Sequence, residues 1–172
     1  MWLKRIVIIV LLGLPMDVEA GPLGYTMDLI YGEHNTRGIK LAYQYNSKFL
    51  RQYIDKLDVY FETSINFWEY GRSNKHDTNF VISISPIIHY PLMRVGDRQV
   101  FLEFGIGASL LDDVHFAGND VSTHYQFEDR LGLLAHFGKS SLGVRWLHYS
   151  NAGIKRPNPG LDFFSLSYTR RF

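Results

Sequence analysis

The sequence predicts an all-β fold, an eight-stranded antiparallel transmembrane β-barrel of the outer-membrane type. Three observations lead to this prediction. Apolar and polar side chains alternate in segment after segment. The apolar faces are about nine to eleven residues long, as a tilted membrane-spanning strand requires. The chain also contains 11 tyrosines and 12 phenylalanines, which suit both strands and the aromatic belts at two membrane–water interfaces.

Residues 1–20 read as a secretory signal peptide. "MWLKR" is a short basic segment, "IVIIVLLGLPM" is an apolar run too short to span a bilayer, and Val18 and Ala20 are small residues at the positions that a signal peptidase reads. We expect cleavage after Ala20, which leaves residues 21–172 as a single barrel domain. An uncleaved membrane anchor is the alternative, and the shortness of the apolar run disfavours it.

Period-two alternation places the first four strands at roughly 23–33, 37–47, 57–70 and 78–90. Residues 24–33 and 37–46 alternate between apolar and polar side chains. In "LDVYFETSINFWE" most odd positions are apolar and most even positions are polar. "FVISISPIIHY" sets isoleucines and aromatic rings on one face against two serines and a histidine on the other.

The same pattern places the last four strands at roughly 99–110, 123–137, 140–151 and 161–172. "VFLEFGIGASL" and "YQFEDRLGLLAHF" alternate in this way. In the seventh strand the apolar Leu142, Val144 and Trp146 alternate with Gly143 and Arg145. "FFSLSYTRRF" sets aromatic and leucine side chains against serine, threonine and arginine.

Alternating strands fit a soluble sandwich, with the apolar face inside, or a membrane barrel, with that face toward lipid. The polar faces carry many charges, which a narrow lumen can pair into a network: Asp28, Lys40, Asp58, Glu62, Glu103, Glu128, Arg130 and Arg145. The chain ends in Phe172 at the close of an alternating strand, which resembles the terminal signature of bacterial outer-membrane barrels. Together with the signal peptide, these features favour the membrane barrel.

Composition excludes several classes of function. A net charge of +1 gives no electrostatic footprint for a nucleic acid. The chain has no cysteine, so it has no disulfide, no thiolate nucleophile and no cysteine–metal cluster. No oxygen-ligand cluster for calcium stands out. We therefore expect a membrane as the partner, with no nucleic acid, no metal and no cofactor.

The topology predicts the orientation of the barrel, with both termini at the periplasmic end. The connections expected in the periplasm are 48–56, 91–98 and 138–139, and those expected outside the cell are 34–36, 71–77, 111–122 and 152–160. Outer-membrane barrels usually have the longer loops outside. The connection 111–122 fits that rule, whereas 48–56 is longer than expected.

The candidate site lies in "RWLHYSNAGIKRPNPGLD", residues 145–162. His148 and Ser150 share the lipid-facing parity of Trp146, and Asp162 shares that of Phe164 in the next strand. These two strands are antiparallel neighbours, so the three polar side chains are expected in one patch at the level of the outer leaflet. Polar groups that face lipid are functional candidates because they are costly to place there.

A hydroxyl, an imidazole and a carboxylate are the parts of an activated serine nucleophile. The imidazole takes the serine proton and the carboxylate orients the imidazole. Asn151, or the backbone N–H groups of Ala152 and Gly153, would stabilise the oxyanion of a tetrahedral intermediate. The alternative from the residues alone is an ordinary polar girdle at the membrane surface, followed by a turn.

"HYSNAGIKRPNPGLD" resembles the C-terminal signature of the outer-membrane lipid A 3-O-deacylases, the PagL family. The resemblance implies an eight-stranded barrel with a catalytic triad on its lipid-facing exterior. It implies His148 as the base, Ser150 as the nucleophile, Asn151 as the oxyanion-hole asparagine beside Ala152 and Gly153, and Asn158 as a second motif asparagine. The family's orienting acid is usually glutamate, whereas this chain has the shorter Asp162.

The implied activity is that of a carboxylic ester hydrolase acting on the lipid A of lipopolysaccharide. It would remove the ester-linked 3-hydroxyacyl chain at the 3-position, in the outer leaflet of the bacterial outer membrane, by serine chemistry that needs no metal. Two alternatives stay open: a non-enzymatic structural or adhesive barrel, and another lipid acyl hydrolase or acyltransferase. The sequence also leaves open a homodimer.

Overall fold

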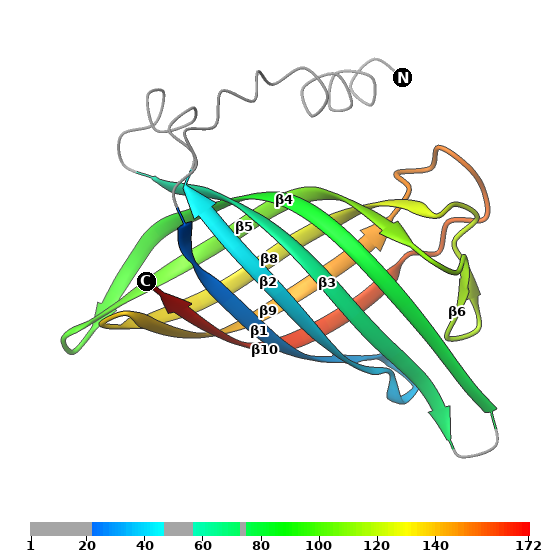
Figure 1. Ribbon diagram of the computed structural model, residues 1–172, viewed down its shortest axis with the longest axis horizontal. Helices are drawn as coiled ribbons and strands as arrows, with labels where there is room; N and C mark the ends of the chain where they lie inside the picture. The colour runs from blue at the N-terminus through cyan, green and yellow to red at the C-terminus, as the bar shows by residue number, and fades with distance from the viewer. Residues whose placement is uncertain (1–21, 47–56, 73–74) are drawn as a thin grey trace.

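The computed structural model describes residues 22–46, 57–72 and 75–172, and most of them form one closed antiparallel barrel (Figure 1). The strand order around the barrel is β1-β10-β9-β8-β5-β4-β3-β2. The predicted signal peptide and the predicted connection 48–56 lie outside the described residues. In the part of the chain that is described, no helix has the length and apolar character needed to cross a membrane.

All eight predicted strands are confirmed. The barrel strands are β1 (Pro22–Gly32), β2 (Arg37–Asn46), β3 (Asp58–Arg72), β4 (Lys75–Val95), β5 (Arg98–Leu111), β8 (Tyr125–Phe137), β9 (Ser140–Ser150) and β10 (Leu161–Arg171). A 3₁₀ helix, η1 (Glu33–Asn35), joins β1 to β2, and a small separate hairpin consists of β6 (His115–Phe116) and β7 (Asn119–Asp120).

The prediction of a connection over 91–98 was wrong. β4 continues to Val95, and the connection is a tight turn at 96–97 where Gly96 has a φ of +62°. The predicted strand ended at residue 90, just before Pro91, and a proline disfavours a strand interior because it cannot donate a ladder hydrogen bond. The structure accommodates it with a shift of pairing register between Pro91 and Met93, as a β-bulge allows.

The two ends of the barrel differ (Figure 1). The start of β1 and the red C-terminal end of β10 lie at one end, together with the turns at 96–97 and 138–139. η1, the β6–β7 hairpin and residues 151–160 lie at the opposite end, which we name the loop end. Strand β9 therefore runs toward the loop end, and β10 runs back from it.

The barrel has an apolar exterior and a polar interior, the reverse of a soluble protein. Outward apolar side chains such as Leu131, Val144 and Leu166 are about half exposed. The interior holds buried charged and polar side chains: Asp28, Lys40, Gln44, Glu62, Asn66, His89, Glu103, Glu128, Arg130 and Arg145. This distribution agrees with the predicted membrane barrel and contradicts a sandwich.

The buried charges are paired across the lumen. Arg145 on β9 donates to both carboxylate oxygens of Asp28 on β1, at 2.8 and 3.0 Å. It also donates to both carboxylate oxygens of Glu103 on β5, at 2.6 and 3.0 Å. One guanidinium thus joins three strands, and its planar fork of donors suits two carboxylates at once.

A second group of charges lies next to the first. Arg130 on β8 donates to Glu62 on β3 at 2.6 Å and to Glu128 at 2.8 Å. Lys40 on β2 donates to the same Glu128 oxygen, and the Tyr149 hydroxyl donates to the other oxygen at 2.9 Å. These contacts connect strands on opposite sides of the barrel, which fills the narrow lumen with paired groups.

The interior becomes apolar toward the loop end. Trp68 packs against Phe116, Tyr149 and Phe163, with ring centroids 5.8, 4.8 and 4.6 Å apart. Phe116 belongs to the β6–β7 hairpin, so the segment 111–122, predicted only as a connection, begins in β5 and then covers the interior. Burial of these rings stabilises the packing of the β6–β7 hairpin over the interior, because apolar area is removed from water.

We expect Arg145→Met to destabilise the barrel by about 3–5 kcal/mol, because Asp28 and Glu103 would keep buried charges without their partner. The measurement is urea unfolding in phospholipid vesicles, followed by tryptophan fluorescence. Arg94→Met is the matched control, since Arg94 is exposed and, among the described residues, its side chain donates to the Asp97 carbonyl alone, at 3.2 Å. Its expected effect is within about 0.5 kcal/mol. Equal stability of the two variants would contradict the structural role of Arg145.

Candidate active site

Three of the predicted site residues, His148, Ser150 and Asp162, lie on the outside of β9 and β10, near the loop end. Trp146, His148 and Ser150 share one face of β9, because side chains two positions apart on a strand point the same way. Asp162 on β10 is directly opposite His148 in the antiparallel register. The pairing register of the two strands therefore brings the imidazole and the carboxylate together.

His148 and Asp162 form a hydrogen-bonded pair. The distance from His148 Nδ1 to Asp162 Oδ1 is 2.9 Å, and the side chains are 25% and 44% exposed. When Nδ1 carries the hydrogen and donates it to the carboxylate, Nε2 is left as an acceptor. That tautomer is the one in which an imidazole can take a proton from a hydroxyl.

Ser150 is the last residue of β9 and faces the same side as His148. Two positions on a strand are separated by about 7 Å between Cα atoms. Among the described residues no hydrogen bond joins the Ser150 hydroxyl to His148. The structure thus brings His148 and Asp162 into direct contact and places Ser150 beside them.

Asn151 lies just after Ser150, and its side chain is fully buried. Its amide nitrogen donates to the carbonyls of Val121 and Lys155, each at 3.0 Å. Its backbone N–H donates to Asn158 Oδ1 at 3.1 Å. Both predicted motif asparagines therefore hold the loop after β9 by hydrogen bonds. The side-chain amide of Asn151 is already bonded to two carbonyl groups.

The turn that follows has an unusual backbone. Ala152 has a φ of +52° and Gly153 a φ of +72°, in the left-handed region. The N–H of Ile154 donates to the Asn151 carbonyl at 3.0 Å and closes the turn. Ala152 and Gly153 are both exposed, so this turn presents main chain to the surface beside Ser150.

Gly160 supports the His148 side chain from the loop before β10. Its φ is +77°, and a Cβ atom at this position would lie 2.6 Å from His148 Cε1 and 3.3 Å from Nε2. Only glycine leaves room for the imidazole there and adopts this backbone at low cost. The sequence suggested a turn residue at 160 and gave no sign of the contact.

Asp129 is a residue near the site that the sequence reasoning missed. It lies on β8 directly opposite His148, so the histidine is flanked by an acidic residue on each neighbouring strand. The hydrogen bond to His148 comes from Asp162. The parity of "YQFEDRLGLLAHF" places Asp129 on the outward face, and that signal could have identified it.

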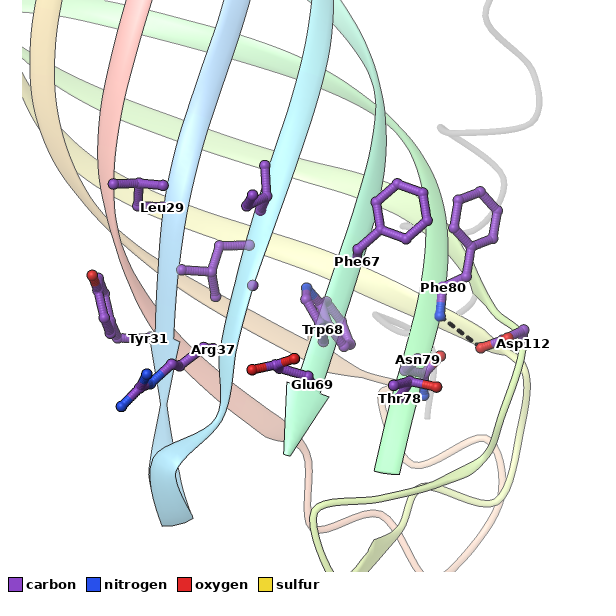
Figure 2. Close-up of a pocket in the computed structure, with 13 residues that line it drawn as sticks. Leu29, Tyr31, Arg37, Phe67, Trp68, Glu69, Thr78, Asn79, Phe80 and Asp112 are labelled. Carbon is purple, nitrogen blue, oxygen red and sulfur yellow. Dashed lines mark hydrogen bonds between the residues drawn. The ribbon is translucent and has the colours of Figure 1, made fainter. Parts of the chain in front are cut away.

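Some of the hollows in the described part of the protein lie near this end of the barrel. Asp162 lines a small one of about 200 Å³, with Glu33, Thr36, Asn119 and Gly160 among its other residues. A larger one of about 540 Å³ lies over β1–β4 (Figure 2). Its apolar lining includes Phe67 and Phe80, and Figure 2 shows the bond from the Phe80 N–H to Asp112 Oδ1. Its lining residues include no serine–histidine pair.

Comparison with known proteins identifies relatives. The family model described as lipid A 3-O-deacylase (PagL) matches residues 37–171. The chain is 31% identical to the lipid A deacylase PagL of Pseudomonas aeruginosa over 137 residues, covering 77% of this chain and 76% of that protein. It is also 31% identical to the lipid A deacylase PagL of Bordetella bronchiseptica over 153 residues, covering 87% and 83%.

A solved structure has the same fold. The crystal structure of the outer membrane enzyme PagL matches with a TM-score of 0.73 at 24% sequence identity. The match covers 87% of this chain and 99% of that one. The eight-stranded barrel is therefore shared with a protein of known structure.

We expect Gly160→Ala to displace the His148 ring from Asp162, because the added methyl group would overlap the imidazole. The measurement is the His148 Cε1–Hε1 signal in an NMR spectrum of the protein in micelles, assigned with His148→Asn. Gly96→Ala is the matched control: its φ is also positive, at +62°, but no atom lies within 4 Å of the added carbon. Both variants carry the backbone strain of about 1–2 kcal/mol, and only Gly160→Ala should move the signal.

Proposed function

The chain belongs to the lipid A 3-O-deacylase (PagL) family, and on that premise we propose that it hydrolyses the ester-linked 3-hydroxyacyl chain at the 3-position of lipid A. The observation that carries the proposal is the hydrogen-bonded His148–Asp162 pair on the apolar exterior, with Ser150 on the same face. A site on the outer wall is accessible to an ester that lies within the membrane, without passage through the lumen.

In the proposed reaction, His148 Nε2 takes the hydroxyl proton of Ser150 as the oxygen attacks the ester carbonyl. Asp162 accepts the Nδ1–H bond, holds the tautomer and stabilises the imidazolium. The tetrahedral intermediate expels the sugar oxygen, which receives the proton from His148. Water then attacks the acyl-enzyme and gives its proton to His148. The bond between the acyl carbon and Ser150 Oγ breaks, Oγ takes the proton back from His148, and the free 3-hydroxy fatty acid is released.

The position of Asp162 supports its proposed role as the orienting acid, although its side chain is shorter than that of glutamate. The direct register with His148 brings its carboxylate to 2.9 Å from Nδ1. A well-aligned carboxylate at hydrogen-bond distance is what the role requires. We therefore propose a Ser-His-Asp triad for this chain.

For the oxyanion hole we propose the main chain of the turn that follows Ser150, with Gly153 as a donor. The side-chain amide of Asn151 is bound to two carbonyls in the loop, so its role in this arrangement is to shape that turn. Asn158 has the same effect through its bond to the Asn151 backbone. Backbone N–H groups held in place before the reaction stabilise an oxyanion effectively because little reorganisation is needed.

The surroundings of the triad suit an amphiphilic substrate in the outer leaflet. The polar hollow beside Asp162 lies toward the loops, where the sugar head group would be. The exposed Trp146 and Phe164 lie farther from the loops, where an acyl chain would run along the wall. We propose that the loop end faces the cell exterior and that residues 1–20 are removed on export.

We expect the full chain, expressed in a Gram-negative host with hexa-acylated lipid A, to remove one 3-hydroxyacyl group from that lipid A. Mass spectra of the lipid A and detection of the free fatty acid measure the reaction. Ser150→Ala and His148→Ala should reduce the rate roughly 10⁴-fold or more, and Asp162→Ala by at least about 100-fold. Ser140→Ala, at the opposite end of β9, should keep the wild-type rate.

Three results would contradict parts of this proposal. Unchanged lipid A in the presence of a folded wild-type barrel, confirmed by heat-dependent gel mobility, would overturn the deacylase function. Transfer of the acyl chain to an acceptor, with no free fatty acid, would identify a transferase. A large loss of rate in Asp129→Asn combined with full activity in Asp162→Ala would move the orienting role to Asp129.

A further inference from the structure

Trp146 makes a contact that an ordinary membrane-surface aromatic does not need. Its indole Nε1 donates to Asp162 Oδ1 at 3.0 Å. This is the same oxygen that lies 2.9 Å from His148 Nδ1. The carboxylate of the His148–Asp162 pair therefore has two donors on a single atom.

The Trp146 ring also lies against the His148 ring. The two ring centroids are 5.6 Å apart and the planes meet at 23°, which is a stacked arrangement. Both residues are on the outward face of β9, and Asp162 is directly opposite His148. The indole thus contacts both members of the pair, one through its N–H and the other through its face.

These contacts answer a problem that the exposed position creates. The Asp162 side chain is 44% exposed, so water can compete for the carboxylate and let it rotate. A second N–H on Oδ1 restricts that rotation, and charge-assisted hydrogen bonds of this kind are among the stronger ones. The stacked indole also restricts the rotation of the imidazole.

We propose that Trp146 is a positioning residue for the His148–Asp162 pair. Its indole N–H holds Asp162 Oδ1 in line with His148 Nδ1, and its ring keeps the imidazole in place. The inference rests on the proposed deacylase function and goes beyond it, since Trp146 would act through His148 and Asp162 and not on the ester itself.

Two simpler roles for Trp146 predict different behaviour. A tryptophan that only anchors the barrel at the membrane surface would affect stability and leave the reaction rate of the folded protein unchanged. A tryptophan that only contacts the acyl chain would affect KM, and its effect would persist after the Asp162 carboxylate is removed. A positioning residue affects kcat, and its effect disappears when the carboxylate is absent.

The experiment is a double-mutant cycle on the full chain in micelles, with purified lipid A as substrate and released 3-hydroxy fatty acid as the readout. Trp146→Phe keeps a ring and removes the N–H, and is expected to lower kcat about tenfold at a nearly unchanged KM. In the Asp162→Ala background, Trp146→Phe should have no further effect. Additive losses, or a loss confined to KM, would overturn the proposal.

Tyr168→Phe is the matched control for these rates. Tyr168 is an outward aromatic on β10 whose hydroxyl lies 3.2 Å from the Ser140 hydroxyl, far from the site along the strand. Loss of its hydroxyl should leave kcat unchanged. A wild-type protein that releases no fatty acid would refute the proposed function, whereas an active wild type with an unaffected Trp146→Phe would refute this inference alone.

A second measurement does not depend on activity or on the folding of the Trp146 variant. In an NMR spectrum of protein with ¹⁵N-labelled tryptophan, the Trp146 indole proton should move upfield in Asp162→Ala, because its acceptor is gone. The Trp68 indole should not move, since its nitrogen has no hydrogen-bond partner in the described part of the chain. An unchanged Trp146 signal would contradict the hydrogen bond on which the proposal rests.

Discussion

The register of the barrel depends on the charged groups enclosed in it. Arg145 joins β9 to β1 and β5 through Asp28 and Glu103, all fully buried. A shift of one residue in the pairing of a strand would turn every side chain to the other face. Such a shift would expose these charges to lipid and leave their partners unpaired, which is costly on both counts. The network therefore selects one register among those that the alternating strands allow.

The candidate site on the outer wall follows from that register. Arg145 points into the lumen, so Trp146, His148 and Ser150 on the same strand point outward. The pairing of β9 with β10 then sets Asp162 opposite His148. A polar contact between two outward side chains is thus positioned in part by the ion pairs that Arg145 makes on the inner side of β9.

The loop after Ser150 is held by a segment from elsewhere in the chain. Asn151 Nδ2 donates to the Val121 carbonyl, and Lys155 Nζ donates to the Ser122 carbonyl at 3.1 Å. Val121 belongs to the apolar cluster that Phe116 and Trp68 form at the loop end. The packing that covers the interior therefore also fixes the turn beside the serine, which links the barrel's stability to the shape of the site.

Alternation along the chain was sufficient to predict the eight strands, their outward faces and the grouping of His148, Ser150 and Asp162, because period-two patterning is a local property of each segment. The folded barrel decided the bulge at Pro91, the apolar cluster at the loop end and the hydrogen bonds of the Asn151 amide. It also decided the pairing of Asp129 with His148 and the two donors on one Asp162 oxygen. Each of these depends on contacts between segments that are far apart in the chain or on different strands. Side-chain reach and rotamer decide such contacts, and neither is encoded in the alternation of polar and apolar residues.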